Sequence, residues 1–457
     1  MKKKDGYAEF AAYLEKEPDT RYLELLAADM NGILRGKRAD VDDAKKIYQN
    51  AVNWCAATLV LDAKGGTFDT IPMGGDDGDP DVRAHVVPGT LAPVPWAKTP
   101  SAQAIVEMTL FDGTPYTFDT RQVLRHALRP LTDLGLHPVM AAELEFYLVD
   151  HDGNNFIPHM PRIPGSDLPQ DGRQYGMMED LEAVDDFLAD VDAWCQLQNV
   201  PAGAALAEFS PGQFEINLHH ADDPLRACEH ALMLKRVIKA AALKHGLAAT
   251  FMAKPFAGIP GSGLHIHVSL LDDDGNNVFA GECSDGAFSE TLRHAIGGLA
   301  ATMGESMAIY APNANSYRRF VRGAFVPSTP NWGVNHRGVA LRIPLSSPVN
   351  NRVEIRVAGA DANPYLVTAA VMAGLHHGIR NLCEPGRMIQ QREEIEDLVT
   401  LPIHWPQALD AFEAGAILPR YLGEEFSRIF AICRREESNR FQTEVSNRDY
   451  EWYLRAV

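Results

Sequence analysis

Four short segments alternate strictly between apolar and polar positions, and this period of two predicts half-buried β-strands. They are ELEFYL (143–148), FEINLH (214–219), LHIHVSL (264–270) and RVEIRV (352–357). Their polar positions carry carboxylates, imidazoles and guanidiniums, whereas solvent-facing strands usually carry Thr, Ser or Lys. Placed side by side in one sheet, the four strands would set a wall of metal ligands beside a wall of arginines. The pattern predicts an active site for metal-dependent phosphate chemistry.

The rest of the chain mixes helical and strand patterns, which indicates the α+β class. Residues 22–38 are predicted to form a hairpin that turns at Asn31-Gly32. Apolar residues recur at helical spacing from Asp119 onward, and either Asp119 or Thr120 is the expected N-cap of a helix. Further helices are expected at 179–198, 223–245, 287–307 and 364–381. The change of pattern near 112–118 predicts two domains, residues 1–115 and 116–457.

Composition narrows the class of protein. The chain has 457 residues, and its net charge of −19 argues against a nucleic-acid or anionic-membrane partner. Six scattered cysteines without a CxxC pair predict no disulfide framework and favour a reducing cytoplasm. The start MKKKDGYAEF lacks the apolar region of a signal peptide, and no apolar run approaches the ~20 residues that span a bilayer.

The carboxylates suggest a metal site. Glu143 and Glu145 share a strand face, with side chains about 6–7 Å apart. Glu208 and Glu215 flank a Pro-Gly turn that can fold both toward a common point. Glu354 and His265 come from two other strands. Any single glutamate is most often an unrelated surface acid, but such an oxygen-rich set suits Mg²⁺ or Mn²⁺ rather than zinc.

Histidines and arginines complete the candidate chemistry. In GIPGSGLHIHVSL (258–270) a glycine-rich turn leads into a strand with two histidines on one face, of which one could bind metal and the other a phosphate or nucleotide. Arg342, Arg352 and Arg356 lie in strand-like segments with apolar neighbours. Charged residues in such surroundings are usually paired or bind an anion. The candidate anions are ATP phosphates and a substrate carboxylate.

Several strings of the sequence together resemble a known family. The strings ELEF, EFSPGQFEINLHH, KPFAGIPGSGLHIHVSL, NSYRR, NHRGVALRIP and RVEIRVAGADANPYL are similar to the signature blocks of class I glutamine synthetases, and DMNGILRGKR resembles their N-terminal domain. The resemblance implies a β-grasp N-terminal domain and a catalytic domain with a curved antiparallel sheet and helices. It also implies a dodecamer of two stacked hexameric rings, with active sites between neighbouring subunits.

The resemblance also implies a role for each matching residue. Two or more divalent ions, Mg²⁺ or Mn²⁺, would be held by Glu145, Glu208 and Glu215, and by Glu143, His265 and Glu354. L-glutamate would be gripped by Arg319, Arg356 and the backbone of Gly261, close to Glu145. ATP would be bound by Arg337, Arg342, Arg352, His267 and Ser269. Catalysis would depend on charge stabilisation by the metals and arginines, with Arg337, Arg356 and Glu354 central.

Departures from the family pattern bear on the nucleophile. Glutamine synthetases carry a glutamate that binds and deprotonates ammonium where this chain has Phe325, and their DGSS motif is replaced by LDAKGGTFDTIP. The segments RVAGADANPYL and YEWYL are similar to the corresponding segments of γ-glutamylpolyamine synthetases, including those that act on putrescine. We expect a cytoplasmic ATP-dependent γ-glutamyl–amine ligase with a primary amine as acceptor. Alternatives are a γ-glutamylmethylamide or other small alkylamide synthetase, and a glutamine synthetase with a modified ammonium site. A non-catalytic relative is disfavoured by the full metal and arginine set.

Overall fold

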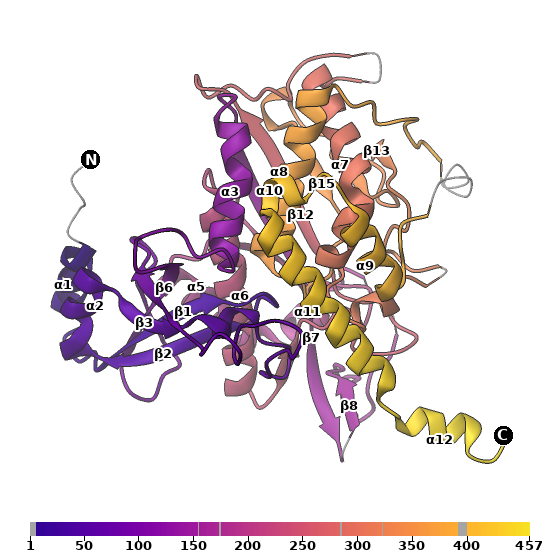
Figure 1. Cartoon of the computed structure of the whole chain (residues 1–457). Helices are drawn as coiled ribbons and strands as arrows, with labels where there is room; N and C mark the ends of the chain where they lie inside the picture. Colours follow the sequence, from indigo (N-terminus) through magenta and orange to yellow (C-terminus); the bar gives the residue numbers. More distant parts are fainter. Residues whose placement is uncertain (1–5, 154, 173–174, 284–285, 322, 392–399) are drawn as a thin grey trace.

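The computed structural model describes residues 6–153, 155–172, 175–283, 286–321, 323–391 and 400–457. Within these residues the chain forms two β-sheets flanked by helices, the α+β architecture that the sequence predicts (Figure 1). One sheet uses strands from the first quarter of the chain, and the other uses strands from the middle. The candidate site residues lie on the strands of the second sheet or in the segments that connect them.

The first sheet has the strand order β2-β1-β6-β4-β3, with β5 paired to β6. Its strands and flanking helices are β1 (Tyr22–Ala28), β2 (Leu34–Asp40), β3 (Val52–Cys55), β4 (Asp81–Val86), β5 (Ala92–Pro93), β6 (Ser101–Thr109), α1 (Gly6–Lys16) and α2 (Ala44–Asn50). The predicted hairpin is confirmed: β1 and β2 are antiparallel and joined by a turn in which Gly32 has φ 75°. A residue with a Cβ atom is disfavoured at this left-handed backbone position, so glycine suits the turn.

The second sheet has the order β13-β14-β15-β12-β7-β10-β9, with β8 and β11 paired to β7. The four alternating segments therefore lie side by side at its centre, as expected. The strands are β7 (His137–Asp152), β8 (Asn155–Pro158), β9 (Ala202–Ala207), β10 (Gln213–Leu218), β11 (Ala248–Thr250), β12 (Leu264–Leu271), β13 (Trp332–Val334), β14 (Leu341–Ile343) and β15 (Val353–Ile355).

The two faces of this sheet have opposite character. The apolar positions of the alternating strands, such as Leu144, Phe146 and Leu264, are fully buried. They face the side on which α6 (Pro224–Lys244) and α3 (Thr120–Thr132) pack against β7. The polar positions lie on the opposite face and build the candidate site. Alternation along each strand therefore decides which side chains enter the core and which enter the site.

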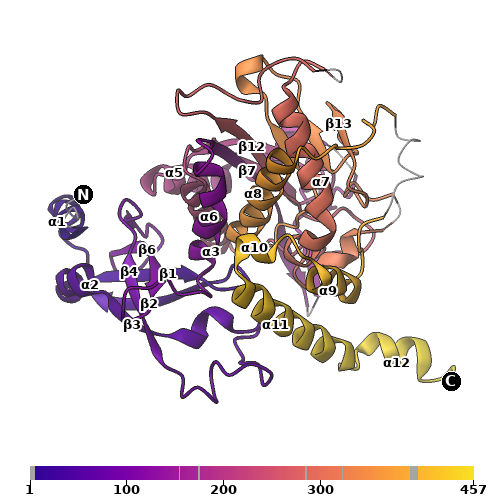
Figure 2. The same ribbon diagram turned by 45° about the horizontal axis from the view of Figure 1, so that its top comes forward.

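Helices cover the apolar face in a packed layer (Figure 2). The remaining helices are α4 (Met178–Glu182), α5 (Asp185–Leu197), α7 (Glu290–Tyr310), α8 (Pro364–Asn381), α9 (Trp405–Ala414), α10 (Pro419–Leu422), α11 (Glu424–Thr443) and α12 (Asn447–Tyr453). The predicted bounds of α8 are confirmed. The prediction of one continuous helix at 179–198 is wrong, because Val184 has φ −122° and ψ 23° and separates α4 from α5. No helix in the described ranges is both long and apolar enough to cross a membrane.

Asp119 joins the two sheets. As the N-cap of α3 it accepts a hydrogen bond from the Arg121 backbone N–H at 2.9 Å, and its second carboxylate oxygen accepts one from the Met108 N–H of β6 at 2.7 Å. The side chain is almost completely buried. One carboxylate thus satisfies two backbone donors, one at the end of the first sheet and one at the start of the helix that packs on the second.

Candidate active site

The register of the second sheet brings polar side chains from different strands into rows. Glu215 of β10 lies opposite Glu145 of β7. His265 of β12 lies opposite Glu143 of β7. In the neighbouring row, Glu354 of β15 is placed between His267 of β12 and Arg342 of β14. Because directly opposed residues have Cβ atoms about 4.5–5.5 Å apart, each row forms a cluster of side chains.

Among the described residues, these rows and Glu208 of the turn before β10 give three groups of possible metal ligands whose donor atoms lie within 4.8 Å of one another. The groups are Glu145, Glu208 and Glu215; Glu143, Glu215 and His265; and Glu143, His267 and Glu354. The first group is the first ligand set that the sequence suggested. In the second suggested set, His265 Nδ1 lies 3.2 Å from Glu143 Oε2 and 3.7 Å from Glu354 Oε1.

Electrostatics indicate that the first group needs positive charge. Burial raises the pKa of Glu215 to about 9, and the carboxylates of Glu143, Glu145 and Glu208 add to the rise. Burial, followed by repulsion from Glu145, raises the pKa of Glu208 to about 7. Buried like charges oppose ionisation of one another, and a divalent cation among them removes that cost. The oxygen-rich donor set therefore fits a hard cation such as Mg²⁺ or Mn²⁺.

Glu143 has the opposite electrostatic character. Burial by itself would raise its pKa, but hydrogen bonds from His265 and His267 hold the pKa well below the usual range. His267 Nε2 lies 2.9 Å from Glu143 Oε1. The strand pattern left open which of the two histidines binds metal, and the family resemblance implied a nucleotide role for His267. Its place in the third ligand group also allows a metal-ligating role. The signal was present in the alternation, since His265 and His267 share one strand face.

Hydrogen bonds fix the orientation of Glu145. Its Oε2 accepts from the Gly263 backbone N–H at 2.8 Å and from Gln213 Nε2 at 3.3 Å. The same Gln213 amide donates to the carbonyl of Gly261 at 3.0 Å. A Cβ at Gly261 would lie 2.2 Å from the Ala253 carbonyl oxygen and 2.8 Å from Arg319 Cγ, so only glycine fits there. The glycine-rich turn therefore lets Arg319 pack directly against the backbone beside the carboxylates.

The predicted arginines divide into two sets. Arg342 and Arg356 both pair with the fully buried Glu354, Arg342 through Nη1 to Oε2 at 2.8 Å and Arg356 through Nη1 to Oε1. Arg319 is buried and donates from Nη1 to the Val357 carbonyl at 3.1 Å. Arg352 and Arg337 are more open: Arg352 donates from Nε to His267 Nδ1 at 3.3 Å. Arg337 donates from Nη1 to the Tyr175 hydroxyl at 3.2 Å.

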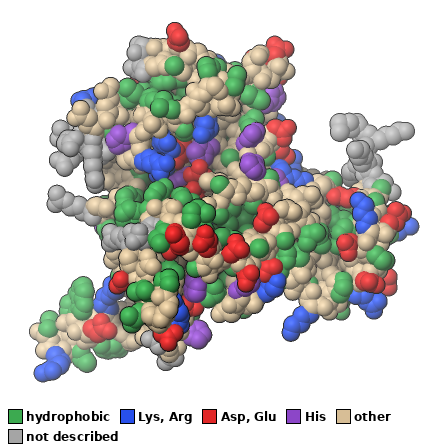
Figure 3. Space-filling model, turned by 180° about the vertical axis from the view of Figure 1, so that it is seen from behind, with side chains coloured by type: hydrophobic (Ala, Val, Ile, Leu, Met, Phe, Trp, Pro, Cys, Tyr) green, Lys and Arg blue, Asp and Glu red, His purple; other side chains and the backbone are tan. Residues whose placement is uncertain are grey.

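A cleft of about 680 Å³ adjoins the ligand groups. Its lining includes Glu143, His267, Ser269 and Arg352, together with Asn217, His219 and His220, to which the sequence assigned no role. Three of the five residues expected to bind ATP therefore line this cleft, namely His267, Ser269 and Arg352. Histidine, basic and acidic side chains gather in a hollow on the face of the molecule that Figure 3 shows. The cleft has the size of a small-molecule site.

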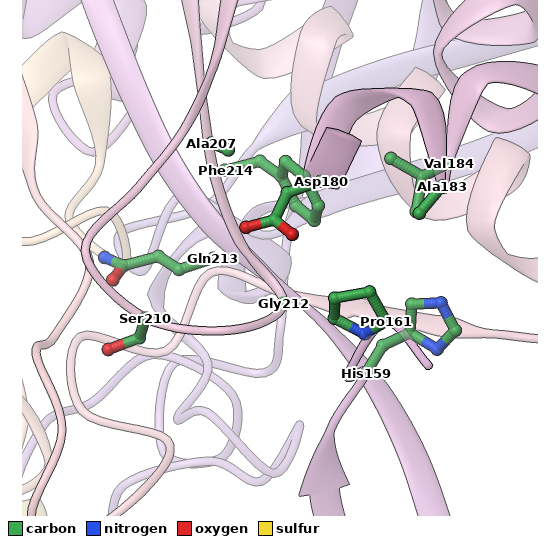
Figure 4. Close-up of a pocket in the computed structure, with 10 residues that line it drawn as sticks. All are labelled: His159, Pro161, Asp180, Ala183, Val184, Ala207, Ser210, Gly212, Gln213 and Phe214. Carbon is green, nitrogen blue, oxygen red and sulfur yellow. The ribbon is translucent and has the colours of Figure 1, made fainter. Parts of the chain in front are cut away.

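A second, much smaller cavity lies behind the 208–213 turn (Figure 4). Ser210 and Gln213 border it on one side and His159 and Pro161 on the other. Its volume of about 10 Å³ accommodates about one water molecule. The cavity is therefore too small to bind a substrate.

Phe325 lies in an aromatic group at the edge of the carboxylates. Its ring centroid is 4.9 Å from that of Phe209 in an edge-to-face arrangement, and Phe209 is 6.4 Å from Tyr175. Sequence reasoning singled out Phe325 but missed Phe209 and Tyr175. Phe209 lies beside the Pro-Gly turn and outside the alternating strand pattern, and Tyr175 lies in a long irregular segment without periodicity, so neither gave a usable signal.

Comparisons with known proteins agree with this geometry. The family model described as "Glutamine synthetase, catalytic domain" matches residues 117–453. The gamma-glutamylputrescine synthetase PuuA of Escherichia coli (strain K12) is 40% identical over 449 residues, covering 98% of this chain and 94% of that protein. A glutamate–isopropylamine ligase of Pseudomonas sp is 33% identical and covers 79% of each chain. The solved structure of a GmaS/ADP complex (conformation 1) superposes with a TM-score of 0.83 at 26% identity, covering 97% of this chain and 99% of that one. The chain therefore belongs to the glutamine synthetase family.

Proposed function

We propose that this protein is an ATP-dependent glutamate–amine ligase that joins the γ-carboxylate of L-glutamate to a primary alkyl amine. The observation that carries the proposal is that Glu143 and His267, which belong to the ligand groups, line a cleft of about 680 Å³. Glu354 of the same ligand group as His267 is paired with both Arg342 and Arg356. Catalysis of phosphoryl transfer is mainly positioning and charge stabilisation, and this arrangement supplies both.

In the proposed reaction, the γ-carboxylate of glutamate attacks the γ-phosphorus of ATP, which gives γ-glutamyl phosphate and ADP. The amine nitrogen then attacks the acyl carbon, and phosphate leaves. Arg319 and Arg356 would orient the glutamate carboxylates, and Arg337, Arg342 and Arg352 the phosphates, with His267 and Ser269 at the nucleotide. Divalent cations held by the six predicted ligands would neutralise the phosphate charge.

The acceptor is proposed from the aromatic group and from relatives. Phe325 cannot accept a proton from ammonium, but an aromatic ring can pack on carbon and offer its face to a cation. PuuA is named for putrescine and the Pseudomonas sp enzyme for isopropylamine. A diamine such as putrescine is our first choice of acceptor. Methylamine or another small alkyl amine is the alternative acceptor, because the replacement of the ammonium-binding glutamate by Phe325 is equally compatible with a small alkyl amine.

The setting of this reaction follows from the same resemblance. We propose two domains, residues 1–115 and 116–457, and a homo-oligomer of two hexameric rings. The separate strands of the two sheets, in residues 22–109 and 137–355, support the division. We also propose a cytoplasmic location, which the six free cysteines support.

The experiment is ATP- and glutamate-dependent phosphate release measured across ammonium, methylamine, ethylamine, ethanolamine, putrescine and spermidine. We expect kcat/KM for a primary alkyl amine to exceed that for ammonium by at least about tenfold, or roughly 1.4 kcal/mol. Activity should rise between pH 7 and 9, because an alkyl amine with a pKa of roughly 10 becomes neutral in part over that interval. Ammonium outperforming every alkyl amine would contradict the proposal.

A further inference from the structure

Three aromatic side chains from distant parts of the chain meet beside the carboxylates. Tyr175 precedes α4, Phe209 lies in the turn between β9 and β10, and Phe325 precedes β13. The rings of Phe209 and Phe325 are at 68° with centroids 4.9 Å apart, and those of Tyr175 and Phe209 are 6.4 Å apart. We call these three residues the aromatic slot.

The slot is open to solvent although it is apolar. Phe325 is 61% exposed and Tyr175 is 49% exposed. Single exposed apolar residues are normal, but aromatic residues gathered beside a functional site indicate a ligand. Within the described residues, no segment of this chain buries the outer faces of Phe325 and Tyr175. A bound hydrocarbon would remove them from water.

Two members of the slot connect to the candidate site. Phe209 follows Glu208 directly, and its backbone N–H donates to Glu208 Oε2 at 3.2 Å. The Tyr175 hydroxyl accepts from Arg337 Nη1 at 3.2 Å. The charge of Arg337 in turn acts on Glu208. The slot therefore combines an apolar wall with a carboxylate at its inner edge, which is complementary to a cation attached to a carbon chain.

On the basis of the proposed ligase function, we propose that Phe209 and Tyr175 act with Phe325 as the determinants of acceptor chain length. The aromatic slot binds the methylene groups of the amine while the amine nitrogen lies toward Glu208. Phe209 contributes the inner wall, because it contacts both of the other rings. Tyr175 also links the slot to Arg337, one of the proposed phosphate-binding residues.

The test is the dependence of kcat/KM on chain length in methylamine, ethylamine, propylamine and butylamine. A fully buried methylene contributes about 0.8 kcal/mol, which corresponds to about fourfold per carbon. We expect the wild-type enzyme to gain about two- to fourfold per methylene. Phe209→Ala should reduce this gain to less than about 1.5-fold, and Phe209→Leu should retain an intermediate gain. Phe111→Ala, at an exposed phenylalanine on the first sheet side, is the matched control and should leave the gain unchanged.

Three results separate the inference from the function on which it rests. If Phe209→Ala and Phe209→Leu lower kcat/KM equally for every amine, Phe209 is structural and the inference is wrong, while the ligase function stands. If ammonium is the best acceptor of the wild-type enzyme, both are wrong. Tyr175→Phe keeps the ring but removes the hydrogen bond to Arg337, so it should lower kcat for all amines and leave the gain per methylene intact. If Tyr175→Phe changes the gain in kcat/KM per methylene, the assignment of the Tyr175 ring to the amine chain and of its hydroxyl to Arg337 is wrong.

Discussion

Glu145 and Glu215 lie directly opposite each other in the antiparallel pair of β7 and β10. One of these two carboxylates, Glu215, has a pKa raised to about 9 by burial and then by its acidic neighbours, so the pair is suited to hold a divalent cation. The pair is the centre of the first ligand group, which Glu208 completes.

Removing one carboxylate of the pair should abolish catalysis while leaving the fold intact. Glu145→Ala and Glu215→Ala should each lower turnover by at least about a hundredfold, or roughly 2.7 kcal/mol. Unfolding monitored with and without Mn²⁺ should show a smaller metal-dependent rise of Tm than in the wild-type protein, because ligand binding stabilises the folded state. The exposed Glu17 provides a control, since Glu17→Ala should change neither quantity. Near-wild-type activity of either site variant in ordinary magnesium would refute the ligand assignment.

Arg319 and Arg356 should act as carboxylate clamps. A planar guanidinium pairs with a carboxylate through two parallel hydrogen bonds, which an ammonium group cannot reproduce. Arg319→Lys and Arg356→Lys should therefore raise the KM for glutamate or lower kcat by about tenfold or more, although the charge is kept. Arg318→Lys is the matched control, because Arg318 adjoins Arg319 but is exposed and lies over the Phe441 ring. Steady-state kinetics that do not distinguish Arg356→Lys from the wild type would make Arg356 structural.

Replacing Phe325 should change the preferred nucleophile. Phe325→Glu introduces a carboxylate that can bind ammonium and accept its proton, so the ratio of kcat/KM for ammonium to that for butylamine should rise by at least about tenfold. The switch should remain partial, because the DGSS motif is also replaced. Phe325→Leu separates loss of the ring from gain of the charge. An equal shift in both variants would show that the carboxylate has no specific effect.

Asp119 should be a strong stability determinant. Asp119→Ala removes the N-cap of α3 and leaves the buried N–H of Met108 without its acceptor. The expected loss is about 2–4 kcal/mol in the free energy of unfolding, from the cap and the unsatisfied donor together. Asp119→Asn keeps one carbonyl acceptor and should lose less. Urea unfolding of both variants measures the difference, and equal losses would contradict the two-acceptor role.

Lys235 should make stability depend on pH. Its Nζ donates to the Ala360 carbonyl oxygen at 2.6 Å, and burial lowers its pKa to about 7. The unfolded chain, with a lysine pKa of about 10.4, then binds more protons than the folded chain between pH 7 and 10. The contribution of Lys235 to the free energy of unfolding should therefore increase as pH rises through this window. Lys235→Met should remove that part of the slope, which urea unfolding at pH 7, 8 and 9 measures. An unchanged slope would show that Lys235 keeps an ordinary pKa.

Much of the fold was predictable from local pattern. The period of two in the four alternating segments identified the strands and the face on which each side chain lies, because strand geometry alone alternates side chains. The bounds of α8 and the cap of α3 followed from helical periodicity and from capping preferences. The prediction of one continuous helix at 179–198 was wrong because the residues around Val184 are all compatible with a helix. The backbone nevertheless departs from helical angles at Val184 and separates α4 from α5.

By itself, the sequence determined the strands, their polar faces and the chemistry of the ligands, because these depend on residue type and local periodicity. Only the tertiary structure decided which residues oppose one another. The pairing of Glu145 with Glu215, the contact of His267 with Glu143 and the bond between Tyr175 and Arg337 join segments from 70 to 162 positions apart. Such contacts arise from strand order, register and loop packing. Register follows from hydrogen bonding between whole strands and from burial of their apolar faces, which no single segment specifies.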